Sequence, residues 1–263
     1  MMIRKGVAVR MVYDLQKGSM WKRISAFLFD FIMLSIIAVL FALSISFATG
    51  YDGYQKQFRS AYSRIEEEFQ ISMNLSYSEY EALTEDELGR LNSAYTALRN
   101  DEEAMHNYNM ITTLTQLILT LSILAAVLIW EFAIPLKLRD GRTLGKRIFG
   151  LAVMRTDGVR VNTVSLLIRA LLGKYTIEIM IPVLIMLMVY MGSIGIIAPI
   201  ILFLILAVQL ALLLFTKTNS LIHDLLANTV VVDYMSQMIF DTPEAMIAYK
   251  EKIAAEEALR QPY

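Results

Sequence analysis

Several ionisable side chains of this 263-residue chain fall at the ends of, or inside, long apolar runs. Asp30 is the single charge in a run that follows Arg23 and reaches to about residue 49. A carboxylate in such a run is retained only when it faces protein, water or a partner. Glu131 ends a second apolar run, and Glu178 begins a third. We therefore predict a polar cluster at one membrane depth, made of Arg23, Asp30, Glu131, Glu178 and Asp224, with Lys146, Arg147, Arg169 and His223 in support.

Two kinds of chemistry fit these residue types. Carboxylates at a shared depth could take up a proton or a small cation, because low polarity favours the protonated form and so suits coupled exchange. Alternatively, the cations neutralise the acids and lock the helices to a neighbouring loop. Arg23 and Asp30 share a helix face but lie about 10 Å apart along the axis, which is far for a direct pair. Both interpretations stay open at this point.

Composition excludes several other classes of site. The chain has no cysteine, so disulfides, thiolate metal sites and a cysteine nucleophile are excluded, and its two histidines are too far apart in sequence for a zinc pattern. We expect no cofactor. A net charge of −1 gives no reason to expect a nucleic-acid partner. Ser220, His223 and Asp224 are too close in sequence to form a catalytic relay, so we predict that the protein is not an enzyme.

The glycines and basic residues of the middle loop do not form a phosphate-binding loop. Three residues separate Gly141 from Gly145 where that motif needs four, and Arg147 follows Lys146 where it needs Ser or Thr. We expect Lys146 and Arg147 to meet anionic lipid headgroups or carboxylates such as Asp224.

The apolar content of 56% and the mean hydropathy of +0.51 indicate an integral membrane protein. We predict an all-α membrane protein with four transmembrane helices, a cytoplasmic loop that contains a β-hairpin, and an extracytoplasmic helical hairpin. The predicted order is a cytoplasmic tail (1–22), a first helix (23–49), the helical hairpin (50–109), a second helix (110–136), the basic loop (137–174), a third helix (175–191), a fourth helix (195–216) and a cytoplasmic C-terminal segment with a helix (217–263).

Lysine and arginine counts beside the spans set the predicted orientation. The tail through Arg23 holds six, the loop 137–174 holds nine, and the longer segment 50–109 holds five against twelve acids. Because cytoplasmic loops carry the excess of basic residues, we place both termini and the basic loop in the cytoplasm. The basic start lacks a short apolar core with a cleavage site, so we expect an uncleaved first helix.

Local patterns predict the elements outside the spans. Thr84 and Glu87 form a capping-box signature inside the helical hairpin, where Tyr54, Phe58, Ile65 and Phe69 share one helical face. The Asp157-Gly158 pair predicts a hairpin turn, and residues 230–232 look like a strand. We expect a short membrane-surface helix around 164–173 and a tight turn near 191–193 between the last two spans. Pro243 predicts the start of a C-terminal helix.

Three ordered motifs resemble the RDD family of small bacterial membrane proteins. They are Arg23-x-x-Ala26-x-x-x-Asp30, the stretch Thr143 to Gly150 with its Asp157-Gly158 turn, and His223-Asp224-Leu-Leu-Ala-Asn-Thr229. The resemblance implies that Arg23, Asp30 and Asp224 are the Arg and two Asp for which the family is named. It also implies a bacterial inner (cytoplasmic) membrane and a polar core, and some members have been proposed as sodium/proton antiporters.

This chain departs from the usual family pattern at a few places. It has a long acidic hairpin and a C-terminal helix, with Leu144 where Pro is common and Asn228 where Gly is common.

We predict small-cation/proton exchange through the polar cluster. Four spans are few for such a carrier, so we expect it to act as an oligomer. The alternative is a non-enzymatic scaffold or accessory subunit that binds a membrane-protein partner through the hairpin. A third possibility, lipid or small-molecule handling, is permitted by the basic loop.

Overall fold

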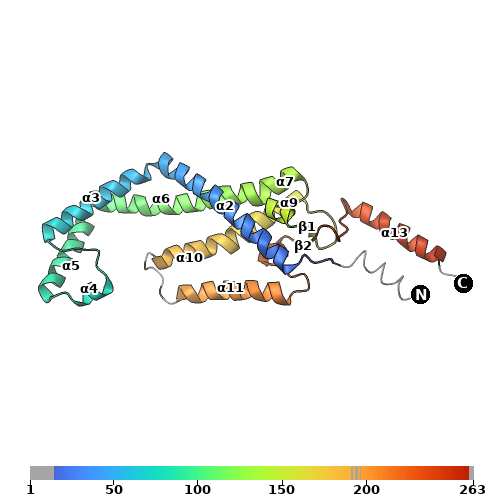
Figure 1. The fold of residues 1–263 in the computed structure, drawn as a ribbon. Helices are drawn as coiled ribbons and strands as arrows, with labels where there is room; N and C mark the ends of the chain where they lie inside the picture. The colour runs from blue at the N-terminus through green and yellow to red at the C-terminus, as the bar shows by residue number, and fades with distance from the viewer. Residues whose placement is uncertain (1–14, 191, 193–194, 196, 261–263) are drawn as a thin grey trace. The chain divides into compact units, whose positions relative to one another are not determined.

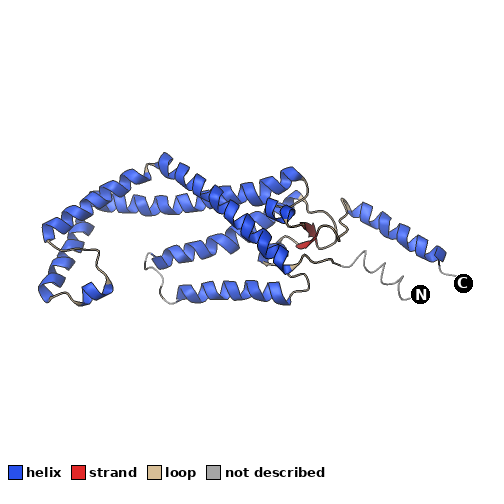
Figure 2. Ribbon diagram, viewed as in Figure 1, coloured by secondary structure: helices blue, strands red, loops and turns tan. Residues whose placement is uncertain are grey.

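The computed structural model describes residues 15–190, 192, 195 and 197–260 (Figure 1). The chain forms two compact units. One unit contains the residues up to Ile37 together with those from Ile123 onward, and the other is Ala38–Ser122. Helices dominate both units, and the strands are confined to the first (Figure 2).

Four helices in the described part of the chain are long and apolar enough to cross a membrane, which confirms the predicted fold class. Helix α2 spans Met20–Thr49, and α11 spans Ile197–Phe215. The second candidate joins α6 (Glu102–Val127), the π-helical segment η1 (Leu128–Ala133) and α7 (Ile134–Leu138). The third joins α9 (Thr163–Ile168), the π-helical segment η2 (Arg169–Met180) and α10 (Ile181–Tyr190). Their outer surfaces expose large apolar side chains such as Phe31 and Phe203, as expected for helices solvated by lipid.

The predicted separate surface helix around 164–173 does not exist as a distinct element. Helix continues without a break from Thr163 to Tyr190. The charged residues and the glycine in this stretch suggested a helix end, but Arg169, Lys174 and Glu178 all find partners inside the unit. Because these charges are satisfied, the helix does not need to end before them. The predicted turn at 191–193 lies mostly outside the described residues.

A two-stranded antiparallel sheet joins distant parts of the first unit. Strand β1 (Leu151–Arg155) follows the short helix α8 (Leu144–Ile148), and β2 (Thr229–Asp233) follows α12 (Ile222–Leu226). Val153 pairs with Val231 at the centre of the register. The first four residues of each strand are buried, so both faces of the sheet are covered. This explains why the strands are continuous apolar runs and not alternating ones.

The predicted turn at Asp157-Gly158 forms, and the strand-like run 230–232 is a strand. Gly158 has a φ of 90° and donates its N–H to the Arg155 carbonyl at 3.0 Å. The local hairpin is short, since it contains a single bridge, between Met154 and Arg160. The full-length partner of β1 is β2, more than 70 residues away, and local turn signals could not reveal that pairing.

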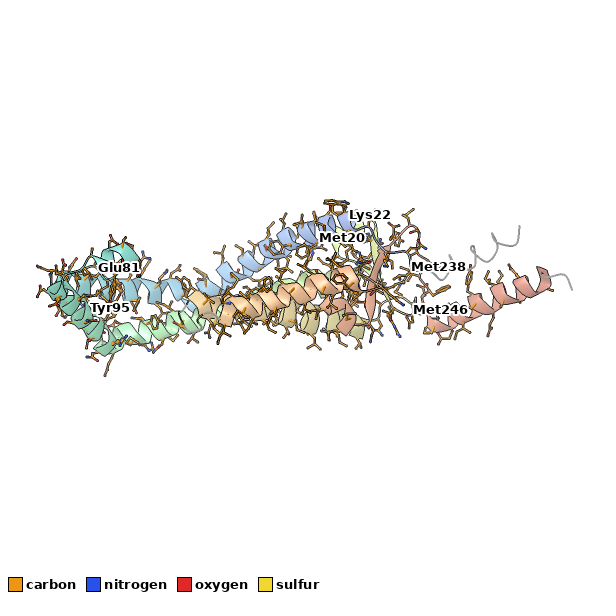
Figure 3. The ribbon with its side chains drawn as sticks, turned by 90° about the horizontal axis from the view of Figure 1, so that it is seen from below. Met20, Lys22, Glu81, Tyr95, Met238 and Met246 are labelled. Carbon is orange, nitrogen blue, oxygen red and sulfur yellow. The ribbon has the colours of Figure 1, made fainter. Side chains whose placement is uncertain are left out.

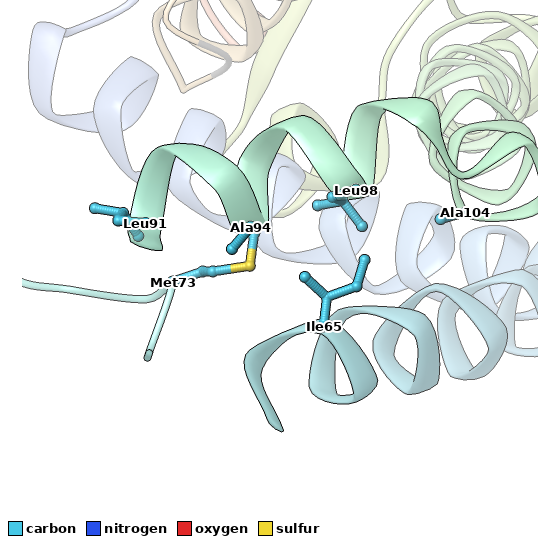
Figure 4. Packing of buried hydrophobic residues seen from close by; sticks show 6 residues of the cluster. All are labelled: Ile65, Met73, Leu91, Ala94, Leu98 and Ala104. Carbon is cyan, nitrogen blue, oxygen red and sulfur yellow. The ribbon is translucent and has the colours of Figure 1, made fainter. Parts of the chain in front are cut away.

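The acidic segment, residues 50–109, is helical as predicted. Helix α3 (Tyr51–Phe69) begins after Gly50, whose φ of 68° interrupts the helix that precedes it. Helices α4 (Tyr77–Glu81) and α5 (Glu85–Asn100) both start with capping boxes, and the one at Thr84 and Glu87 confirms the sequence prediction. A core of buried apolar residues holds the segment together; it consists of Ile65, Met73, Leu91, Ala94, Leu98 and Ala104 (Figure 4).

The C-terminal helix α13 (Pro243–Arg260) starts at the predicted proline, and the Thr242 hydroxyl accepts the Ala245 N–H at 3.2 Å. The chain before it is attached to the region after β1. Arg160 pairs with Asp241 at 2.9 Å, and the rings of Phe240 and Tyr249 lie 5.5 Å apart. Met246, labelled in Figure 3, has its sulfur close to Gly158.

Candidate functional site

Asp30 accepts hydrogen bonds from several groups that are far away in sequence. Trp130 Nε1 and the Gly145 N–H donate to Oδ1, each at 2.9 Å, and the Thr143 hydroxyl donates to Oδ2 at 2.5 Å. The residue is only 4% exposed. A buried carboxylate with this many donors has little need for an ion or for water.

Glycine at position 145 is what lets α8 approach α2 this closely. A Cβ at this position would lie 2.6 Å from both Asp30 Oδ1 and the Ala26 carbonyl oxygen, closer than real Cβ contacts. Thr143 caps α8 by accepting the Lys146 N–H at 3.4 Å, while its hydroxyl proton goes to Asp30. The sequence motif at 143–150 therefore supplies the hydrogen-bond donors and the lysine that hold the Asp30 carboxylate.

Lys146 is buried between two carboxylates. Its Nζ lies 3.5 Å from Asp30 Oδ2 and 3.9 Å from Glu131 Oε2. Burial lowers the pKa of the Lys146 ammonium, and Glu131 opposes that shift. Glu131 sits on the π-helical segment η1 and also accepts a hydrogen bond from Lys174 on η2. The two π-helical segments thus present their charges to each other.

A second group of charges surrounds Arg169. Its Nη1 pairs with Asp224 Oδ1 and donates to the Thr229 hydroxyl at 2.8 Å. Burial is the largest single influence on the Asp224 carboxyl and raises its pKa, but the Arg169 guanidinium and the smaller contributions of the other polar neighbours together outweigh burial and lower that pKa to about 2. Asp224 also accepts the Leu221 N–H at 3.3 Å. The arginine therefore ties η2 to α12 and to the first residue of β2.

The partners of His223 fix its tautomer. Arg169 Nη2, which can only donate, lies 3.0 Å from Nε2, so Nε2 accepts and the ring proton is on Nδ1. Nδ1 then donates to the Glu178 carboxylate at 2.7 Å. Burial lowers the pKa of His223, Asp224 raises it and Arg169 lowers it further, so the ring is neutral. Gly173 makes this packing possible, because a Cβ there would be 2.3 Å from His223 Cβ.

Arg23 does not pair directly with a carboxylate. Its Nη1 donates to the Asn219 carbonyl at 2.5 Å, and its Nη2 donates to the Val231 carbonyl. Its Nε is buried and has no hydrogen-bond partner among the described residues. Arg23 therefore attaches the start of α2 to the loop after α11 and to β2. This agrees with the sequence prediction that Arg23 lies too far from Asp30 for a direct pair.

Most of the predicted site residues meet, but Arg147 stays apart. It is about half exposed, and its nearest acid is Asp140 at 3.9 Å. Lys146 meets Asp30 and Glu131, whereas we had expected Asp224 or lipid. Sequence reasoning missed Trp130, Thr143, Lys174 and Thr229 as partners. Lys174 lies five residues after Arg169 and four before Glu178, so its helical spacing was an available signal.

The charges of this site cancel. We call the following residues the polar cluster: the carboxylates Asp30, Glu131, Glu178 and Asp224, the cations Arg23, Lys146, Arg169 and Lys174, and the neutral His223. Four negative and four positive charges leave no net charge. In the described part of the chain no group of three or more His, Cys, Asp or Glu side chains is placed to hold a metal ion.

The spanning helices and the buried polar cluster define a multi-pass helical membrane protein with a charged interior. The model of the RDD family matches residues 17–228. The chain belongs to the RDD family, as the three motifs predicted. Searches of curated proteins and of solved structures found no match to the chain. The matched range ends just before β2, so this strand and α13 lie beyond it.

Proposed function

We propose that this chain is a non-enzymatic membrane scaffold or accessory subunit. In this proposal the polar cluster holds the spanning helices on the sheet, and the acidic segment binds a partner protein. Membership of the RDD family supports a bacterial inner membrane location. The distribution of Lys and Arg supports both termini in the cytoplasm and the acidic segment outside.

The charge balance of the polar cluster is the observation that carries this proposal. Asp30, Glu131 and Asp224 each have a lysine or arginine within 4 Å, and Glu178 is held by His223. A cation that entered would have to displace one of these partners and leave it buried without a counter-charge. Breaking a buried pair in this way is strongly unfavourable, so the cluster suits a structural joint better than an ion path.

The contacts of Ser220 support a non-enzymatic role. Its hydroxyl donates to the Thr218 hydroxyl at 2.7 Å, while His223 is engaged by Glu178 and Arg169. A Ser-His-Asp relay needs the histidine to accept the serine proton, and here the two side chains have other partners.

The acidic segment has the features of a protein-binding surface. Its twelve acids against five basic residues favour a basic partner, and Tyr77 and Tyr80 on α4 are exposed beside Glu81. Tyrosines at the surface of a helical tip suit an interface, because they bury a large apolar area and keep a polar hydroxyl.

The test is affinity purification of the full chain from its own membrane, followed by identification of the proteins that co-purify. The reversal Glu81→Lys/Glu85→Lys is compared with Glu251→Lys/Glu256→Lys on α13, which changes the charge equally. We expect a partner to be lost with the first pair only. Co-purification that is the same for the wild type and both variants would contradict the proposal.

Cation/proton exchange is the second candidate, and one observation favours it. Glu178, His223, Arg169 and Asp224 form a continuous chain of polar contacts that contains a histidine, the side chain that titrates nearest to neutral pH. Its test is cation-driven pH change in proteoliposomes with wild type, Asp30→Asn and Asp224→Asn. Exchange in the wild type that both substitutions abolish would support this candidate; no exchange in the wild type would eliminate it.

A further inference from the structure

A polar cavity of about 170 Å³ lies within the unit Ala38–Ser122. It is formed where α3 packs along the first turns of α6, a contact also marked by the rings of Phe58 and Tyr108, 5.6 Å apart. The polar residues that line it are Gln57, Ser60 and Arg64 on α3, with Asp101, Glu103 and Asn107 at the start of α6.

Asn107 at this cavity is exceptional among the buried polar residues. Twelve polar or charged residues of the described chain are buried, and eleven of them form side-chain hydrogen bonds within the protein. Asn107 is 2% exposed and lines the cavity, and no side-chain hydrogen bond joins its amide to a described residue; the amide atoms are not among the fully buried unpaired ones, so they open into the cavity. Because an amide carries both donors and an acceptor, one whose polar atoms reach only this cavity is available to bind a molecule there.

The charged groups around the cavity offer both signs. Arg64 is more than half exposed and uses one nitrogen on Asp101, so its guanidinium keeps free donors. The second oxygen of Asp101 accepts the Ala104 N–H at 3.0 Å, which leaves that carboxylate occupied. Glu103 is exposed and has no ion-pair partner in the part of the chain that the structure describes. One free cationic fork and one free carboxylate therefore flank the unpaired amide.

We propose that this cavity binds a small zwitterion of the α-amino-acid class. The ligand carboxylate pairs with the Arg64 guanidinium, a geometry that arginine favours. The ligand ammonium donates to the Glu103 carboxylate and to the amide oxygen of Asn107. The volume is below the range of drug-sized pockets, so the ligand carries a short side chain.

A bare divalent cation fits this site less well. Calcium takes six to eight oxygen ligands, and the Arg64 guanidinium, which is bound to Asp101 in the cavity lining, opposes a second positive charge. The proposal goes beyond the scaffold function, since it assigns a ligand to α3 and α6 and does not depend on which protein the acidic segment binds.

The experiment is isothermal titration calorimetry, which measures the affinity of the purified full chain in detergent for glycine, alanine and serine at concentrations up to about 10 mM. Ethylamine and propionate, which carry only one of the two charges, are the ligand controls. We expect at least one amino acid to bind and both single-charge analogues to bind about tenfold more weakly or not at all.

Matched variants test the roles of the two α6 residues. Glu103→Gln should weaken binding about tenfold or more, whereas Glu102→Gln, an exposed acid in the same helical turn that does not line the cavity, should leave it unchanged. Asn107→Leu should abolish binding without impairing folding, because the amide makes no internal hydrogen bond to lose. Three results would overturn the proposal: no binding by the wild type, equal effects at positions 102 and 103, or binding by Asn107→Leu.

Discussion

The polar cluster and the core of the acidic segment hold helices together by opposite means. In the cluster, buried charges from α2, η1, η2 and α12 pair with one another, and glycines at 145 and 173 allow the backbones to approach. In the acidic segment, α3 and α5 pack through small and aliphatic residues such as Ile65, Ala94 and Leu98, and their charges stay at the surface.

This difference follows from the solvent that each region meets. Helices in lipid gain no hydrophobic driving force from packing against one another, so polar contacts and close packing must define their arrangement. A helical unit in water gains that force from every apolar residue it buries and keeps its charges solvated. The two regions should therefore be sensitive to different kinds of substitution: the polar cluster to the loss of a charge partner, and the acidic segment to the loss of apolar volume.

Breaking the Arg169–Asp224 pair should cause the largest loss. The substitution Arg169→Met leaves Asp224 buried without its cation, which should cost about 3–5 kcal/mol of unfolding free energy. The double variant Arg169→Met/Asp224→Leu should recover a large part of that loss, because no charge is then left unpaired. Unfolding in mixed detergent measures both, and Arg147→Met at a half-exposed position is the control. A double variant less stable than the single one would contradict this account.

The corresponding apolar change in the acidic segment is Leu91→Ala. Leu91 is 3% exposed, so the cavity left behind should cost about 2–4 kcal/mol. The loss should be confined to this unit, which has its own core. Hydrogen exchange resolves the two regions: amides of α3 and α5 should exchange faster while those of β1 and β2 keep their rates. Faster exchange in the strands would show that the two units unfold together.

Paired glycine substitutions sharpen the contrast further. Gly145→Ala places a Cβ against Asp30 and Ala26 and should destabilise the protein by about 1–3 kcal/mol. Gly89→Ala on α5 meets nothing within 4 Å and should stabilise its helix by about 0.5–1 kcal/mol. Thermal unfolding would measure the change in stability of each variant, and hydrogen exchange would show which unit is affected. Equal effects of the two substitutions would mean that the close approach at 145 has no energetic weight.

The sequence predicted much of this architecture because its strongest signals are local. Hydropathy over about 20 residues located the spans, and the capping box at Thr84 located α5. The motif residues Asp30 and Asp224 are likewise predictable as cluster members, because each stands out locally in the sequence. The family resemblance came from three such local stretches.

Pairing between distant residues could not be predicted in the same way. Nothing near Asp30 in the sequence reveals that Trp130 and Gly145 donate to it, since both contacts depend on where other helices lie. The β1–β2 pairing is also long-range, and the local turn at Gly158 pointed to a different partner. The unbroken helix through Arg169 was missed because charges in a sequence suggest a helix end until their partners are known.

The smallest expected effect is a pH dependence that belongs to the polar cluster alone. Burial lowers the pKa of His223 in the folded protein below the unfolded value of about 6.5. Between these two pKa values the imidazole is protonated in the unfolded chain and neutral in the folded protein, so protonation favours unfolding. Stability should therefore fall as the pH drops below about 6.5, with a slope of at most about 1.4 kcal/mol per pH unit.

The variant His223→Gln tests this origin directly. Glutamine can still donate to Glu178 but does not titrate, so the slope between pH 7 and 5 should flatten. His106 in the acidic segment is exposed, and His106→Gln should leave the slope unchanged. The Asp224 carboxyl does not contribute in this window, because its pKa of about 2 lies well below it and so does the unfolded value of about 3.9. If the slope persists in His223→Gln, the pH dependence comes from a group other than His223. The polar cluster and the acidic segment would then not differ in the pH dependence of their stability.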